Sequence, residues 1–441
     1  MGNVWGASLH PVGYAVFLRD LHALTSAMWP MIALQHLFGL ISAVLLWLAV
    51  RRTGASRWLA LIPAAVLALN GDEMFLEHSV LTESLFVLLL SGSLYCAARA
   101  VGSTSPRWAA LAGLLLALDS TVRVVALPLT AVLVAWVFFG SGGNLKVRAR
   151  ATAYALASIL VVLGGYAVVQ HGKTGYWGLS TPAGAWNLYG RVAPFADCTK
   201  FTPPVGTSVL CEKTPPAQRS QSVEDYLFSP SLSPALKAFS TFGGPETVTQ
   251  ANDRKIASFT RAAIEHQPFD YARTVLEGMA AYVTPARVEF ANREELGAGY
   301  NALYHDLLVE PQNDAFVLHE YLPWYGVHSY HNDQALLSFM LSYETNTRIT
   351  GGLMGLLMVL SLFAPFGPRG RARQIGTLLF LVAWTLLITP PATHQWDARF
   401  AVPPLGPLAA AAAIGAWQVA RLLQRIRRSR RAKPKSICPT T

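Results

Sequence analysis

Charged residues are scarce in this chain. Only 14% of its 441 residues are Asp, Glu, Lys or Arg, and 52% are hydrophobic, whereas an ordinary soluble domain has about 25% charged residues. The hydrophobic residues gather in successive runs of about 15–20, close to the length that crosses a bilayer as a helix. The composition therefore excludes an ordinary soluble protein and predicts a polytopic membrane protein.

One side of the predicted membrane lacks acidic residues. When the apolar runs are threaded back and forth, 19 of the 35 Lys and Arg fall on that side with none of the 25 Asp and Glu. Loops rich in Lys and Arg are typical of the cytoplasmic side. The net charge of +10 therefore reflects topology and does not indicate a nucleic-acid partner. These basic residues are Arg51, Arg52, Arg57, Arg99, Arg107, Lys146, Arg148, Arg150, Arg369, Arg371, Arg373, Arg421 and seven from Arg425 to Lys435.

Cysteine is also rare. Of the four cysteines, Cys96 falls in an apolar run and Cys438 in the basic tail, whereas Cys198 and Cys211 share one long polar stretch. We expect a disulfide between Cys198 and Cys211 on the outer side, with a reduced, separate pair as the alternative. Residues 1–29 show no cleavable signal peptide. The polar stretch has no Asn-X-Ser/Thr acceptor, which favours a bacterial plasma membrane.

The apolar runs predict an all-α fold of about nine transmembrane helices. The run 108–140 is interrupted at Asp119–Arg123, and one span of that length would be too long. We therefore divide it into two short spans that meet at the outer face. The predicted spans are Met31–Val50, Trp58–Asn70, Ser84–Ala100, Trp108–Leu118, Val124–Phe139, Ala151–Val169, Ile349–Phe366, Ile375–Thr389 and Val402–Leu422.

The polar stretch, residues 170–346, is named the inserted domain here. It contains 18 of the 25 acidic residues and has no apolar run, so we expect it outside the membrane. Its first part, to about Phe242, is rich in Pro, Ser and Thr and is predicted to form loops. Apolar residues at helical spacing predict helices at Glu246–His266 and Phe269–Val283. Further helices are expected near Leu296–Leu308 and Gln334–Tyr343.

The remaining regions follow from the same division. Residues 1–29 are predicted to form an outer interfacial segment and residues 30–169 a module of about six helices. Residues 347–424 form a second module of about three helices, and residues 425–441 a basic cytoplasmic tail. No internal repeat is visible, which argues against an inverted-repeat transporter.

Several short patterns occur in an order typical of one enzyme superfamily. They are His10-Pro11-Val12-Gly13-Tyr14, Leu34-Gln35-His36-Leu37-Phe38-Gly39, Leu81-Thr82-Glu83-Ser84-Leu85-Phe86, Thr121-Val122-Arg123, and Trp396-Asp397-Ala398-Arg399-Phe400-Ala401-Val402-Pro403. Together with the predicted topology they resemble the GT-C superfamily, integral membrane glycosyltransferases that use polyprenyl-phosphate sugars. The protein O-mannosyltransferase-like branch is the most similar. The resemblance covers most of residues 10–140 and 375–425 and none of the inserted domain.

The chain departs from this family at its start. Family members begin with a cytoplasmic N-terminus, a first span and an outer loop with an essential carboxylate. This sequence begins where that loop should end, with its N-terminus predicted to lie outside. Two alternatives stay open: a first span precedes Met1, or the chain is a divergent member that lacks the usual carboxylate.

The resemblance implies that an acceptor hydroxyl attacks the anomeric carbon of a lipid-phosphate sugar. This reaction needs a carboxylate base near the acceptor and cations near the leaving phosphate. Asp72 and Glu73 are the candidate bases, with a solvated turn at Asn70–Glu73 as the alternative. Glu83 is a third candidate catalytic residue, and its alternative is a charge favoured at a helix N-terminus. The candidate substrate-binding residues beside them are Glu77 and His78, although an interfacial histidine is more often only solvated.

Arg123 and Arg399 each lie at an outer span junction. A guanidinium group can bind phosphate in a bidentate way, so both are candidate phosphate-binding residues. Ion pairs with Asp119 or Asp397 are the alternative. His10 and Tyr14 are predicted to line the same opening.

A second polar group lies late in the inserted domain. Its spacing matches no strong metal-ligand pattern, so no cofactor is predicted, and a divalent cation stays open. The neighbouring aromatic residues would either stack on a sugar or rest on the membrane surface. The polar residues are His319, His328, His331 and Asp333, and the aromatic ones are Trp324, Tyr325 and Tyr330.

These expectations combine into one hypothesis. The chain is a plasma-membrane glycosyltransferase whose active site lies on the outer face, between the spans and the inserted domain. A polyprenyl-phosphate sugar is the expected donor, and a glycan, lipid or protein the expected acceptor. One alternative is a transporter or flippase for a lipid-linked glycan, which would need polar residues along its spans. The other is a non-catalytic membrane scaffold whose inserted domain binds a partner.

Overall fold

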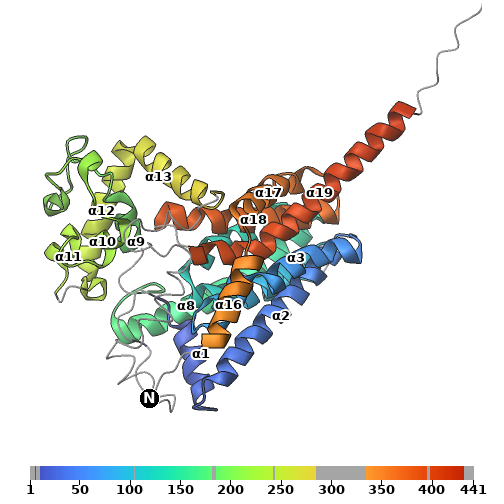
Figure 1. The fold of residues 1–441 in the computed structure, drawn as a ribbon, viewed down its shortest axis with the longest axis horizontal. Helices are drawn as coiled ribbons and strands as arrows, with labels where there is room; N and C mark the ends of the chain where they lie inside the picture. Colours follow the sequence, from blue (N-terminus) through green and yellow to red (C-terminus); the bar gives the residue numbers. More distant parts are fainter. Residues whose placement is uncertain are drawn as a thin grey trace, which may run out of the picture.

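A computed structural model of the chain describes residues 5, 10–103, 105–180, 185–241, 244–284, 334–394 and 398–431. Every regular element among these residues is a helix (Figure 1). The prediction of an all-α protein is therefore confirmed for the described part of the chain.

Five helices within the described residues are long and apolar enough to cross a membrane. Two further helix pairs, bent by 48° and 43°, raise the number to seven if each pair is one span. The chain is thus a helical membrane protein, and the predicted count of nine spans is not confirmed. The five are α2 (Trp29–Arg51), α5 (Glu83–Ala100), α8 (Leu145–Thr174), α18 (Arg371–Thr393) and residues Arg399–Arg428, most of which lie in α19 (Val402–Arg431); the pairs are α3 (Arg57–Leu69) with α4 (Gly71–His78), and α16 (Gln334–Thr347) with α17 (Gly351–Ser361).

The interrupted run forms two short helices. α6 (Arg107–Val122) and α7 (Leu127–Phe139) are joined by a 3₁₀ turn at Val124–Ala126. Both are shorter than the roughly 20 residues that a straight span needs. The N-terminal helix α1 (Gly13–His22) packs on the end of α6, where a Cβ atom on Gly13 would lie 2.7 Å from the side-chain oxygen of Thr121.

Basic residues mark one end of the helix bundle, which we name the basic end. Arg99 lies in the last turn of α5 and Arg371 begins α18, and the Arg371 side chain lies beside Gly102 at the end of α5. The indole of Trp136 near the end of α7 donates a hydrogen bond to the backbone oxygen of Gln374, at 2.9 Å. The ends of α5 and α7 therefore meet the start of α18 at this end.

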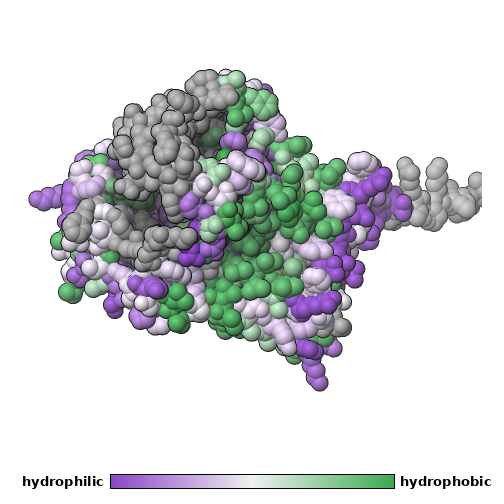
Figure 2. Space-filling view, turned by 90° about the horizontal axis from the view of Figure 1, so that it is seen from below, coloured by the Kyte–Doolittle hydropathy of each residue, from purple (hydrophilic) through white to green (hydrophobic). Residues whose placement is uncertain are grey.

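A hydrophobic belt crosses the middle of the face seen in Figure 2, with hydrophilic surface on both sides of it. Helix α8 contributes to this apolar surface because only 11% of its most apolar window is buried. Inside the belt, α19 presents a buried run of small residues, Ala409–Ala413, which allows helices to approach closely. Apolar surface facing outward and small residues facing inward are typical of a bundle in lipid.

Residues 185–281 of the inserted domain lie at the end of the bundle opposite to the projecting end of α19 (Figure 1). Its first part contains three helices and a core that includes the fully buried aromatic residues Trp186, Tyr189, Tyr226 and Phe259. The expectation that residues 170–242 form only loops is therefore wrong. The helices are α9 (Ala185–Val192), α10 (Val223–Phe228) and α11 (Pro234–Phe239), followed by α12 (Gln250–His266) and α13 (Pro268–Ala281) at the two positions where helices were predicted; 3₁₀ turns occur at Ser208–Leu210, Pro216–Gln218 and Pro245–Thr247 in this domain and at Ala364–Phe366 and Ala398–Ala401 in the bundle.

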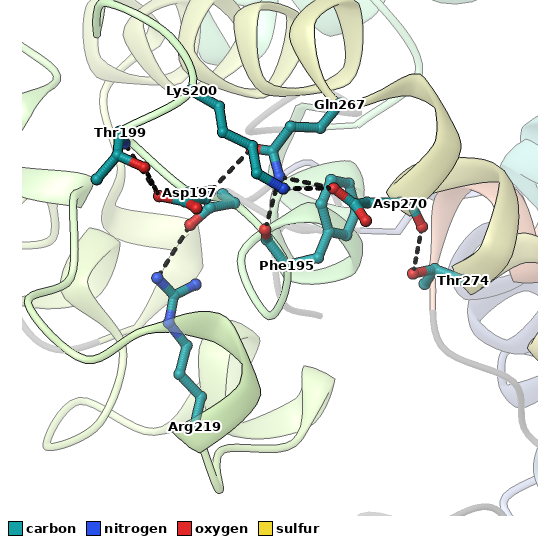
Figure 3. A network of polar contacts seen from close by, with 9 residues as sticks. Phe195, Asp197, Thr199, Lys200, Arg219, Gln267, Asp270 and Thr274 are labelled. Atoms are coloured by element: carbon teal, nitrogen blue, oxygen red, sulfur yellow. Dashed lines mark hydrogen bonds and ion pairs between the residues drawn. The ribbon is translucent and has the colours of Figure 1, made fainter.

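The segment before Cys198 is hydrogen-bonded to the junction between α12 and α13 (Figure 3). The side chain of Gln267 donates to the backbone oxygen of Phe195 at 3.0 Å and accepts from the backbone nitrogen of Asp197 at 2.8 Å. Cys198 then forms a disulfide with Cys211. Hydrogen bonds from Thr199 lower the pKa of Asp197, and those from Gln267 and Lys200 lower the pKa of Asp270.

Helix α13 connects the inserted domain to the end of α18. The hydroxyl of Tyr271 donates to the backbone oxygen of Ala392 at 2.8 Å. Arg191, from α9, is buried in the same junction, where its guanidinium donates to the backbone oxygen of Thr274. Burial lowers the pKa of Arg191 to about 10. These contacts hold the inserted domain against the bundle.

Candidate functional site

The chain bends where α3 gives way to α4. Asn70 has an extended backbone between the two helices, and Gly71 lies so close to α16 that a Cβ atom there would come within 2.8 Å of the Thr347 side-chain oxygen. Helix α4 therefore starts inside the protein, and Asp72 and Glu73 in its first turn are 2% and 1% exposed. The alternative of a solvated turn at Asn70–Glu73 is wrong.

The two candidate bases have different surroundings. Asp72 lies close to Glu344 of α16, and the charges of these two carboxyl groups interact. Neither carboxyl oxygen of Glu73 has a hydrogen-bond partner in the described part of the chain. The charges that act on Glu73 come from Glu77, Glu83 and Asp72. Buried polar groups normally have partners, so of the two candidate bases Glu73 is the one with both carboxyl oxygens available to a ligand.

Helix α2 holds the far end of α4. The amide of Gln35 donates to the backbone oxygens of Glu77 and Ser79, at 2.8 and 2.7 Å, and accepts from the hydroxyl of Tyr14 at 2.9 Å. The carboxyl group of Glu77 lies 2.7 Å from Nδ1 of His36 and fills the space left by Gly39. His36 in turn contacts His78. The Tyr14 hydroxyl is therefore linked to α4 through Gln35.

A second group surrounds the guanidinium of Arg123, at the turn between α6 and α7. Arg123 forms an ion pair with Glu83 at the start of α5 and donates to the Thr82 hydroxyl at 2.9 Å. It also lies over the rings of Phe86 and Phe400, 5.8 Å from each centroid, a favourable cation–π arrangement. Arg123 does not form the alternative ion pair with Asp119, which is buried without a hydrogen-bond partner in the described residues.

Arg399 and His10 complete the Arg123 group. The charges of Arg399 and Arg123 both act on Glu83, so two guanidinium groups face one carboxylate. The surrounding protein atoms and the positive charges of Arg399 and Arg123 lower the pKa of His10. An imidazole that is neutral beside two cations can accept a hydrogen bond from a ligand.

The structure brings all nine candidate site residues to one end of the bundle, which we name the acidic end. They form two groups, and the charge of Glu83 in the second acts on Glu73 in the first. The first comprises Tyr14, Asp72, Glu73, Glu77 and His78, and the second His10, Glu83, Arg123 and Arg399.

Sequence reasoning missed three residues of these groups. Glu344 had a usable signal, because it is the last carboxylate before the span that begins near Ile349. His36 stood as a polar residue within an apolar run. Phe400 had no signal except its place beside Arg399.

The second polar group predicted in the inserted domain lies outside the described residues, and so does Asp397, an alternative ion-pair partner of the arginines. The members of that group are His319, His328, His331 and Asp333, with the aromatic residues Trp324, Tyr325 and Tyr330. Within the part of the chain that is described, no group of three His, Cys, Asp or Glu residues is arranged to hold a metal ion.

The fold and the site together define a helical membrane protein with buried carboxyl and guanidinium groups gathered at one end of its bundle. Comparison of the chain with protein families, characterised proteins and solved structures finds no match. The function must therefore be argued from the site.

Proposed function

We propose that the chain is a membrane glycosyltransferase that transfers a sugar from a polyprenyl-phosphate donor to an acceptor hydroxyl. The supporting observation is Glu73, whose carboxyl group is 1% exposed, has no hydrogen-bond partner among the described residues and lies among the carboxyl groups of the candidate site. An unpaired buried carboxyl group has a high free-energy cost. Such a group is retained where a ligand or a proton will occupy it.

Each group has a role in this reaction. Glu73 takes the proton of the acceptor hydroxyl while the acceptor oxygen bonds to the anomeric carbon. The bond from that carbon to the phosphate oxygen breaks at the same time, and the lipid phosphate leaves with the electron pair. Arg123 and Arg399 stabilise the charge that develops on the phosphate, and Glu83 holds the Arg123 guanidinium in place. Asp72, whose carboxyl group interacts with that of Glu344, is the weaker candidate base.

The topology follows from the same proposal. The basic end faces the cytoplasm, and the acidic end with the inserted domain faces outward from a bacterial plasma membrane. The inserted domain binds the acceptor. A carrier for a lipid-linked glycan receives no comparable support, because the buried carboxyl groups of the described spans lie at the acidic end rather than along the helices.

The test is sugar transfer by the purified protein in liposomes that contain radiolabelled polyprenyl-phosphate sugars. Glu73→Gln should lower turnover by about 100-fold or more, the effect typical of a lost general base. Glu277→Gln is the matched control, because Glu277 is an exposed partner of Arg273 on α13. Absence of transfer by the wild-type protein with every donor tested, or full turnover by Glu73→Gln, would refute the proposal.

A further inference from the structure

Glu77 belongs to a chain of contacts that the proposed reaction does not yet use. Its Oε2 atom lies 2.7 Å from Nδ1 of His36, and Nε2 of His36 lies 3.3 Å from Nδ1 of His78. The Glu77 side chain is 11% exposed and the His36 side chain 34% exposed. The chain of contacts therefore leads from a buried carboxyl group toward the surface of the protein.

Residues of α2 fix the position of Glu77 and of the backbone beside it. Gln35 fixes the backbone at both Glu77 and Ser79, and a Cβ atom on Gly39 would overlap Oε1 of Glu77. Glu73 and Glu77 are four positions apart on α4, so the two side chains are neighbours with about 5–6 Å between their Cβ atoms. Glu77, His36 and His78 thus form a continuous series, and Glu73 lies one helical turn before it on α4.

We propose that Glu77, His36 and His78 carry the proton of the acceptor hydroxyl from Glu73 to the protein surface. This inference rests on the proposed function, because that reaction is the source of the proton. A base that is 1% exposed needs such a route, since it must lose its proton before the next turnover.

Every proton is accounted for in the transfer from Glu73 to His78. Glu73 passes the acceptor proton to Glu77, and protonated Glu77 gives a proton to Nδ1 of His36. At the same time, His36 gives the proton on Nε2 to Nδ1 of His78, and His78 releases the proton on Nε2 to water. One proton enters and one leaves, and each imidazole has exchanged one neutral tautomer for the other. Return to the starting tautomers through solvent resets the path.

A purely structural role for these groups predicts different behaviour. If Glu77 only anchors α4 to α2, an amide in its place should serve nearly as well, because the glutamine oxygen still accepts a hydrogen bond from Nδ1 of His36. If Glu77 carries a proton, the amide must fail. Glu77→Gln separates the two roles without removing the packing against Gly39.

The first experiment measures turnover in the liposome assay. Glu77→Gln and His78→Ala should each lower turnover by about 100-fold, the lower end of what positioned proton transfer contributes. Added imidazole should restore turnover to His78→Ala, because it can occupy the vacated space and carry protons. His171→Ala is the control, since the His171 ring stacks on Trp177 at a centroid distance of 4.1 Å and is not part of the chain. Full turnover by Glu77→Gln, or loss in His78→Ala without rescue, would overturn the relay.

The second experiment does not depend on turnover. Proton titration of the protein with ¹⁵N-labelled histidine, followed by NMR, should show His36 and His78 titrating together, and Glu77→Gln should shift both. Independent titration of the two rings would overturn the relay even in an active enzyme. If the wild-type protein transfers no sugar while the two rings titrate together, the proposed function fails and the proton path remains.

Discussion

Replacing Arg123 by alanine should greatly destabilise the protein. Glu83 is 1% exposed and forms an ion pair with Arg123, whose own side chain is 15% exposed. The substitution removes the cation and leaves the carboxylate enclosed at the start of α5. It also removes the hydrogen bond to the Thr82 hydroxyl.

The expected size of the effect follows from this burial. Removing one partner of a buried ion pair costs about 3–5 kcal/mol, because the remaining charge stays desolvated. Replacing both charges by uncharged groups of similar volume is often close to neutral. We therefore expect Arg123→Ala to lower the free energy of unfolding by about 3–5 kcal/mol, and Glu83→Gln with Arg123→Met to recover most of that loss.

The matched control is an exposed pair on α13. The Arg273 and Glu277 side chains are 80% and 59% exposed and lie 2.8 Å apart at helical spacing. Arg273→Ala should have a much smaller effect, because exposed ion pairs contribute little to stability. Free energies of unfolding are compared by detergent titration in mixed micelles, an assay that does not require turnover. Equal losses in Arg123→Ala and Arg273→Ala would refute the argument from burial, as would a double variant no more stable than Arg123→Ala.

Three further predictions follow from the structure. Replacing Cys198 and Cys211 by alanine should destabilise the inserted domain by about 2–4 kcal/mol, because the disulfide closes a short loop; reductant should destabilise the wild-type protein equally and leave the variant unchanged in chemical denaturation. The pKa values of Asp197 and Asp270 are lowered in the folded state. The two carboxylates therefore stabilise the folded protein fully above the pKa of an unfolded aspartate, about 3.9, and this stabilisation is lost as the pH falls through their lower pKa values in the folded state. Asp197→Asn should reduce the loss of unfolding free energy at low pH, and an unchanged loss would contradict this reasoning. Gly39→Ala should displace Glu77 and lower sugar transfer, whereas Gly164→Ala on α8, where a Cβ atom meets nothing within 4 Å, should not, and equal turnover in the two variants would contradict the role given to Gly39.

The sequence allowed the acidic end to be predicted but not the pairing within it. Asp72, Glu83 and Arg123 could be selected because charged groups at span ends are costly and need a reason. The partners of these groups depend on how distant helices pack, as in the contact between His36 and Glu77, 41 positions apart. Hydropathy carries no information about that packing, and Asp119 and Asp397 were therefore the only ion-pair partners considered for Arg123, whereas Glu83 was not.

The helices of the inserted domain could also be predicted only in part from the sequence. Its helices α12 and α13 were predictable because each has 14 or more residues with apolar positions at helical spacing. α10 and α11 have six residues each, which is too short for a period to be recognised. Their stability comes from tertiary contacts, including the capping box of Ser222 with Asp225 and the aromatic core around Tyr226.

The bond between Val12 and Tyr166 sets the depth of the site in the bilayer. Residues 151–169 of α8 are uncharged and span about 28 Å, close to the roughly 30 Å thickness of the hydrocarbon core. Tyr166 lies about 4.5 Å below the end of that stretch, and a tyrosine at this depth directs its hydroxyl toward the lipid headgroups. That hydroxyl accepts a hydrogen bond from the backbone nitrogen of Val12 at 2.9 Å, which places the segment carrying His10 at headgroup level. A phosphate attached to a membrane lipid would lie at the same level, so a lipid-linked donor could meet the guanidinium groups by lateral diffusion alone.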